Sequence, residues 1–94
     1  MFVLALEVDL HIADARSLKD KRGVIRSIVD GARHRYQVAA AEVGDQNLWQ
    51  RAQLGFAAVS SSQQHTAELI DQVSRFVWSF PEIAVIDEER TWLS

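Results

Sequence analysis

Residues Phe2–Ile12 read FVLALEVDLHI, and a large apolar side chain occupies every even position of this run. The odd positions hold Val3, Ala5, Glu7, Asp9 and His11. Side chains along a β-strand point alternately to opposite faces, so this alternation predicts a half-buried strand. The even side chains are expected in a core, and the odd ones on an open face.

A helix is predicted after the connection Ala13–Arg16. Ser17 stands three residues before Asp20, which resembles a weak capping box. The apolar residues that follow recur at helical spacing, and they are Leu18, Ile25, Ile28, Val29, Ala32 and Tyr36. Gly31 is the weak point of this helix, because glycine costs about 1 kcal/mol relative to alanine in a helix interior.

The remainder of the chain predicts two strands, a helix and a last strand. Residues Val38–Val43 and Leu48–Val59 flank a turn cluster, which indicates an antiparallel hairpin. Three serines, Ser60 to Ser62, offer N-caps for a helix whose apolar stripe ends at Phe80, before Pro81. Ile83–Leu93 is read as the last strand.

This order, βαββαβ, predicts an α+β fold of the ferredoxin-like type. Such a fold has a four-stranded antiparallel sheet with two helices on one face. The chain has 94 residues and no Pro- or Gly-rich linker, so we expect a single domain over residues 1–94.

Composition excludes several kinds of chemistry. The chain has no cysteine, which removes disulfides, thiolate metal sites and cysteine nucleophiles. Its three histidines, at positions 11, 34 and 65, form no pair at ligand spacing. We therefore expect no metal and no cofactor, assign no catalytic residue, and lean toward a protein that is not an enzyme. The run Phe2–Ile12 carries acids and resembles neither a signal peptide nor a membrane span, so we expect a cytoplasmic protein that does not enter a membrane.

Small side chains dominate the open face predicted for the sheet. Val3 and Ala5 are expected to share this face with Ala57 and Val59, and further members are Ala39, Ala41, Val43 and Gly55. A contiguous patch of this kind is costly to leave in water and suits the close approach of a second sheet. We therefore predict a homodimer through this face, with a scatter of small residues that water tolerates as the alternative.

The three tryptophans are expected at two kinds of position, one on a helix and two near strand ends. Trp78 falls among polar residues of the second helix, so it is either a contact residue or packed within its own chain. Trp49 and Trp92 lie near predicted strand ends and are read as packing at the rim of the sheet.

Charge is distributed unevenly along the chain. The net charge is −3, yet residues 16–35 hold seven of the ten Lys and Arg residues and two of the thirteen acids. On a helical wheel, four cations fall within an arc of about 60° beside the apolar face. We call them the basic stripe: Lys19, Arg22, Arg26 and Arg33. The stripe predicts a surface for polyanions, with Arg16 and Lys21 in support. The alternative is an ordinary solvated helix face in which Asp30 pairs with Arg26 or Arg33.

Several runs of the sequence resemble the small bacterial YlxP-like family, a domain of unknown function. The resemblance rests on Arg16–Arg22 (RSLKDKR), Ala41–Gly44 (AEVG), Leu48–Gly55 (LWQRAQLG) and Val59-Ser60, and weaker similarity follows in the second predicted helix and at Glu89-Arg90. Gly31 departs from the family pattern, which puts the last turn of the first helix in doubt. The resemblance implies a ferredoxin-like fold and genes that lie near those for translation initiation and ribosome-binding factors. It implies no catalytic residue or substrate.

The leading hypothesis is a non-enzymatic module that contacts RNA or a ribosome-associated protein through the basic stripe. One alternative is a protein–protein adaptor or structural dimer that sets the same helix against an acidic surface, with Trp78 as anchor. Another is a small-ligand protein in which Glu7, Asp9 and His11 line a cleft at a dimer seam.

Overall fold

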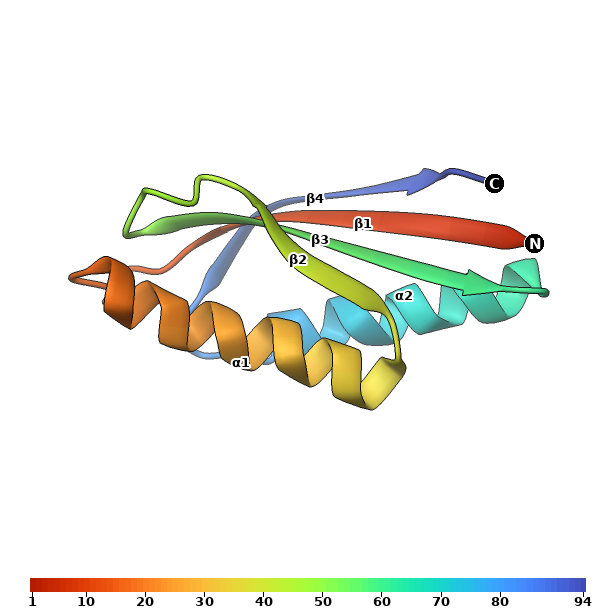
Figure 1. Ribbon diagram of the computed structural model, residues 1–94, viewed down its shortest axis with the longest axis horizontal. Coiled ribbons are helices and arrows are strands. Elements are labelled where there is room, and N and C mark those ends of the chain that lie inside the picture. Colours follow the sequence, from red (N-terminus) through yellow and green to blue (C-terminus); the bar gives the residue numbers. More distant parts are fainter.

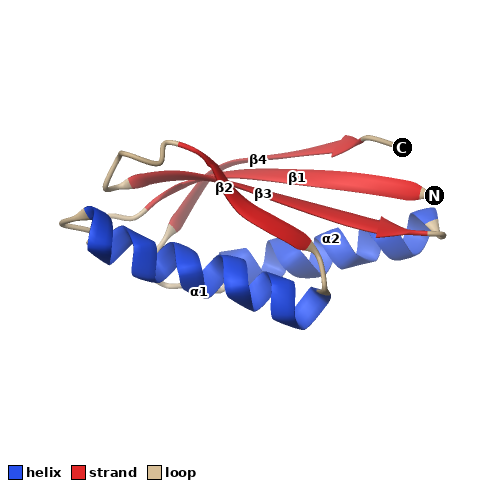
Figure 2. Cartoon of the chain, viewed as in Figure 1, coloured by secondary structure: helices blue, strands red, loops and turns tan.

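Strands and helices alternate along the chain in the predicted order. The computed structural model describes residues 1–94 and contains β1 (Phe2–His11), α1 (Leu18–Tyr36), β2 (Ala39–Gly44), β3 (Arg51–Ser60), α2 (Gln63–Trp78) and β4 (Ala84–Trp92). The strands form one antiparallel sheet in the order β2-β3-β1-β4. Both helices cover the same face of this sheet, and the other face is open (Figures 1 and 2). The ferredoxin-like fold is confirmed.

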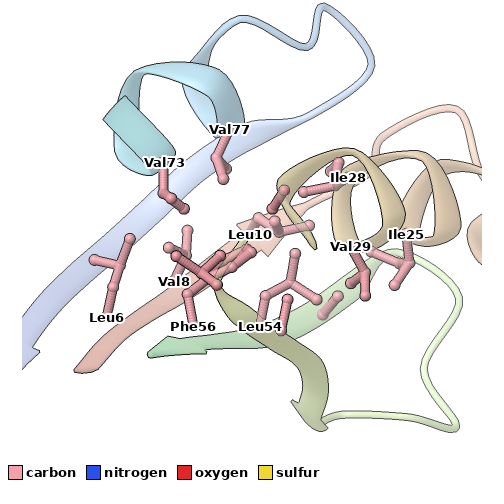
Figure 3. Close-up of a cluster of buried hydrophobic side chains, with 14 of the residues drawn as sticks. Leu6, Val8, Leu10, Ile25, Ile28, Val29, Leu54, Phe56, Val73 and Val77 are labelled. Carbon is pink, nitrogen blue, oxygen red and sulfur yellow. The ribbon is translucent and has the colours of Figure 1, made fainter. Parts of the chain in front are cut away.

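β1 is a central strand, paired with β3 on one side and β4 on the other. Its even side chains, from Leu4 to Leu10, are all buried. They meet Leu54 and Phe56 of β3, Ile25, Ile28 and Val29 of α1, and Val73 and Val77 of α2 (Figure 3). The period of two in the sequence therefore corresponds to the side of β1 that faces the helices.

The start of α1 differs in detail from a capping box. The Ser17 hydroxyl accepts a hydrogen bond from the Asp20 backbone N–H at 3.1 Å, as predicted. The Asp20 carboxylate, however, accepts from the backbone N–H of Arg16, one residue before the cap. The first bond satisfies a donor that the helix N-terminus would leave free, and the second ties the residue before the cap to the first turn.

Gly31 does not interrupt α1, which continues to Tyr36. A Cβ at position 31 would lie 2.5 Å from the ring of Phe76 on α2, closer than carbon atoms can approach. The doubt about the last turn was therefore wrong. The glycine makes room for the second helix at this crossing.

Two element boundaries differ from the sequence expectation by more than one residue. β3 begins at Arg51 instead of Leu48, because residues 45–50 form a loop held by contacts from the first helix that are described below. α2 ends at Trp78 instead of Phe80, since the residue before a proline disfavours the helical conformation. Phe80 still packs edge-on against Phe76, with ring centroids 5.1 Å apart.

Candidate functional site

The basic stripe lies along one exposed flank of α1. Lys19, Arg22 and Arg26 are exposed, and none has a carboxylate oxygen within 4.0 Å. Their spacing of three and four residues places them on one side of the helix. Together they form a positive surface that the chain's own acids leave uncompensated.

Arg33, the fourth member of the stripe, is engaged within the chain. It makes an exposed ion pair with Asp30 at 3.6 Å, and its Nη2 donates to the Ala40 carbonyl of β2 at 2.6 Å. The side chain is still 54% exposed. Of the two arginines that could pair with Asp30, only Arg33 does so, and Arg26 has no carboxylate partner.

These contacts also locate the stripe in the fold. Arg33 ties its flank of α1 to β2, which is an edge strand of the sheet. The opposite flank, which carries Gly31 and Arg35, faces Phe76 of α2. The stripe therefore runs beside the outer edge of β2, away from the second helix (Figure 1).

Lys21 does not belong to this surface, although its position in the sequence suggested that it supports the stripe. Its side chain is 2% exposed. The ammonium donates to the carbonyls of Asp45 at 2.6 Å and Leu48 at 2.7 Å. Nζ also lies 2.9 Å from Glu42 Oε2, an ionic contact that lacks the angle of a hydrogen bond. The whole side chain, charge included, therefore lies inside the protein, where it cannot contact a phosphate.

The buried ammonium organises residues 45–50, the β2–β3 loop. Asp45 adopts a left-handed conformation with φ of 60°, and both carbonyls that bind Lys21 belong to this loop. Gln50 fixes the other side of the loop, because its Nε2 donates to the carbonyls of Ala13 and Ala15. The β1–α1 connection and the β2–β3 loop, far apart in the sequence, are thus joined at one end of the molecule.

This end of the molecule exposes groups that sequence reasoning assigned to other roles. Trp49, expected to pack at the rim of the sheet, is 54% exposed, and Leu48, expected to begin a strand, is 51% exposed on the loop before β3. Arg16 is exposed with no carboxylate partner, next to the Ala15 carbonyl that Gln50 binds. The sequence contains a signal for this exposure. Leu48 and Trp49 directly follow a cluster of turn residues, and an apolar pair in that position is compatible with a loop as well as with the start of a strand.

The open face of the sheet brings four of the five interface candidates together. Val3 is paired across the strands with Val59, and Ala5 with Ala57. A shallow hollow over β2 and β3 extends this apolar area, lined in part by Ala39, Ala41, Val43 and Gly55. The predicted patch of small side chains therefore exists as one surface.

Trp78, the fifth interface candidate, is not part of that surface. It lies on α2, on the opposite side of the sheet (Figure 2), and its indole N–H donates to Glu88 of β4 at 2.8 Å. Ser74 donates to the same carboxylate, also at 2.8 Å. Burial acts to raise the pKa of Glu88, but the bonds from Trp78 and Ser74 and the charge of Arg90 outweigh it and hold the pKa below its ordinary value.

The acidic half of the open face lines no shared hollow within a single chain. Glu7 lies across from Glu89, and Asp9 from Asp87 and Gln53. Asp9 is paired with Arg51 at 2.8 Å. No hollow in the structure is lined by two of Glu7, Asp9 and His11. No group of three His, Asp or Glu side chains is arranged to hold a metal ion.

Comparison with known proteins identifies the family. A family model described as "Protein of unknown function (DUF503)" matches residues 3–90. The chain belongs to the DUF503 family. A DUF503-type relative in Bacillus subtilis (strain 168), "Uncharacterized protein YlxP", is 43% identical over 77 residues, which cover 82% of this chain and 84% of the relative. The predicted YlxP-like resemblance is thereby confirmed.

A solved structure supports the fold of this DUF503 chain but not its function. The chain is similar to a de novo designed protein with a ferredoxin fold, solved by solution NMR, with a TM-score of 0.58 and 11% identity. The similarity covers all of this chain and 87% of the designed one. Neither helix of the DUF503 chain is long and apolar enough to cross a membrane.

Proposed function

We propose that this protein is a non-enzymatic RNA-binding module that contacts phosphates through the basic stripe. The observation that carries the proposal is the set of three exposed cations, Lys19, Arg22 and Arg26, with no carboxylate of their own chain within 4.0 Å. In a chain of net charge −3, such a surface attracts a polyanion locally while the remainder repels it. Such a module acts in the cytoplasm, which also fits a chain without cysteine.

The geometry of the stripe suits a backbone contact. From Lys19 to Arg33 the stripe spans fourteen residues, or about 21 Å along the helix axis. Cations on long, exposed side chains reach phosphate oxygens without reading base edges, so binding is expected to have little sequence specificity. The adaptor alternative has less support, because Trp78 is bonded to Glu88 and lies on the flank of α2 that faces β4, not beside the stripe.

Charge reversal tests the proposal. Binding of a labelled single-stranded RNA oligomer is measured by fluorescence anisotropy at low salt for the wild type and for Arg22→Glu and Arg26→Glu. Each substitution is expected to weaken binding by about tenfold. Arg75→Glu is the matched control, because Arg75 is an exposed, unpaired cation on α2 and its reversal changes the net charge equally. Equal losses in all three variants, or no RNA binding by the wild type, would refute the proposal.

A second proposal concerns self-association: the chain forms a homodimer through the open face of its sheet. The supporting observation is the continuous apolar area around the pairs Val3–Val59 and Ala5–Ala57, in which Val59 is 60% exposed. Small side chains let two sheets approach to about 10 Å. Analytical ultracentrifugation tests it: the wild type should sediment as a dimer and Ala57→Glu as a folded monomer. A monomeric wild type at high micromolar concentration contradicts it.

A further inference from the structure

Trp49 is exposed on a loop that the fold holds firmly. Together with Asn47, Leu48, Gln50 and Arg51, it lines an open hollow of about 420 Å³. The loop is fixed by Lys21 on one side and by Gln50 on the other, and the Gln50 carbonyl accepts from the Ile12 N–H at 2.9 Å. A large aromatic side chain is therefore presented to solvent on a backbone whose conformation is already set. A ligand that binds there meets little ordering cost in the loop.

The lining of the hollow combines one aromatic face with hydrogen-bonding groups. Asn47 and Arg51 line the same hollow as Trp49 and can offer an amide and a guanidinium, whereas the Gln50 amide nitrogen already donates to the carbonyls of Ala13 and Ala15. Arg51 donates from one Nη to Asp9 at 2.8 Å and its Nε is buried, but the side chain as a whole is 42% exposed. A hollow lined by an exposed indole, an amide and a guanidinium suits a planar, polar heterocycle better than an aliphatic side chain, because such a ligand stacks and also accepts hydrogen bonds at its edge.

The hollow also adjoins the proposed phosphate surface. Lys21, which binds the Leu48 carbonyl, lies in the first turn of α1 between Lys19 and Arg22. Arg16 follows the Ala15 carbonyl that Gln50 binds. An RNA strand whose phosphates contact the start of the stripe can therefore extend directly onto the β2–β3 loop.

We propose that the hollow of the β2–β3 loop takes an unpaired RNA base, stacked on Trp49, while the phosphates of the same strand lie on the basic stripe. This inference rests on the proposed RNA binding and narrows its substrate to single-stranded RNA. In a duplex the bases are stacked on one another and are not available to Trp49, so duplex RNA of the same length uses the stripe alone.

Trp49 provides both the contact and the signal for the test. Short oligoadenylate and oligouridylate are titrated into the wild type, Trp49→Ala and Trp49→Phe, and an RNA duplex of equal length is titrated in parallel. Trp49→Ala should weaken single-strand binding by about fivefold or more and leave duplex binding unchanged. Trp49→Phe should keep most of the affinity, because phenylalanine also stacks, but should lose the quenching of tryptophan emission. Trp92→Ala is the matched control: Trp92 is 43% exposed and pairs with Leu4 near the N-terminus, at the opposite end of the sheet (Figure 1).

The outcomes separate this inference from the RNA proposal itself. If Trp49→Ala binds single strands like the wild type while Arg22→Glu and Arg26→Glu lose binding, the base site is refuted and the phosphate surface stands. An equal loss of duplex and single-strand binding in Trp49→Ala also refutes stacking. If the wild type binds no RNA, both proposals fall.

Discussion

Lys21 on α1 and Glu42 on β2 form an ion pair of 2.9 Å in which the lysine side chain is 2% exposed and the glutamate side chain 20% exposed. The same ammonium donates hydrogen bonds to two carbonyls of the β2–β3 loop, so its charge is partnered by two carbonyl oxygens and one carboxylate. A buried charge of this kind is costly to desolvate and is tolerated only when it is fully partnered. This lysine therefore fixes the loop that carries Trp49, whereas its neighbours Lys19 and Arg22 face solvent.

Lys21→Met is expected to destabilise the protein by about 3 kcal/mol or more, because three acceptors lose their partner in a buried setting. Urea unfolding followed by circular dichroism measures the change. Lys19→Met, an exposed neighbour, is the control and should shift stability by less than about 0.5 kcal/mol. Equal stability of the two variants would show that the buried ammonium does not hold the loop.

Gly31→Ala is expected to destabilise the protein by about 1 kcal/mol despite the better helix propensity of alanine. The new methyl group would meet the Phe76 ring, which is held by Tyr36, Phe80 and Arg35. Overpacking by an added methyl group destabilises a core by about 1–3 kcal/mol, whereas replacing glycine by alanine stabilises a helix by about 1 kcal/mol, so the net effect is a loss of stability. In a Phe76→Leu background the same substitution should become neutral or stabilising. Thermal unfolding of the four proteins gives the cycle, and a Gly31→Ala variant more stable than the wild type contradicts the steric explanation.

Glu88 is expected to contribute stability that depends on pH. Its pKa is held below the ordinary 4.5 in the folded state, so the folded protein binds its proton less readily than the unfolded chain does. The contribution of ionised Glu88 to the free energy of unfolding is therefore complete above pH 4.5. It is lost as the pH falls through the pKa of Glu88 in the folded protein. Glu88→Gln should be less stable than the wild type by about 1 kcal/mol at neutral pH.

The difference between wild type and Glu88→Gln should shrink as the pH falls below 4.5. Denaturant unfolding at a series of pH values measures it. The control is Glu82→Gln, because Glu82 is exposed and makes no ion pair. A stability difference that stays constant down to acid pH would mean that the Trp78 and Ser74 bonds do not favour the charged carboxylate.

Much of the fold follows from local pattern. The alternation in β1 and the helical spacing in α1 and α2 reflect which face each element buries, so they predict the order of elements and the two-layer arrangement. The local pattern predicts that β3 starts at Leu48, because nothing near Leu48 reveals that Lys21, 27 residues earlier, binds its carbonyl. The role of Gly31 is hidden from local pattern for the same reason, since its partner Phe76 lies on another helix.

The candidate site also combines features that local pattern predicts with features that depend on tertiary contacts. The exposure of Lys19, Arg22 and Arg26 on one flank follows from helix periodicity, which a sequence contains. Helix periodicity does not predict which cations remain unpaired. The burial of Lys21 and the bond from Arg33 to Ala40 depend on where β2 and the loop after it lie. The exposure of Trp49 likewise depends on tertiary contacts that hold its loop away from the sheet.

The salt dependence of RNA binding tests the central claim most directly. If Lys19, Arg22 and Arg26 each neutralise one phosphate of a single strand, log K should fall linearly with log salt with a slope of about −2. The double variant Arg22→Gln/Arg26→Gln should bring the slope to about −0.7, because one contact remains. A slope near zero in the wild type, or an unchanged slope in the double variant, would contradict a phosphate surface on this flank of α1.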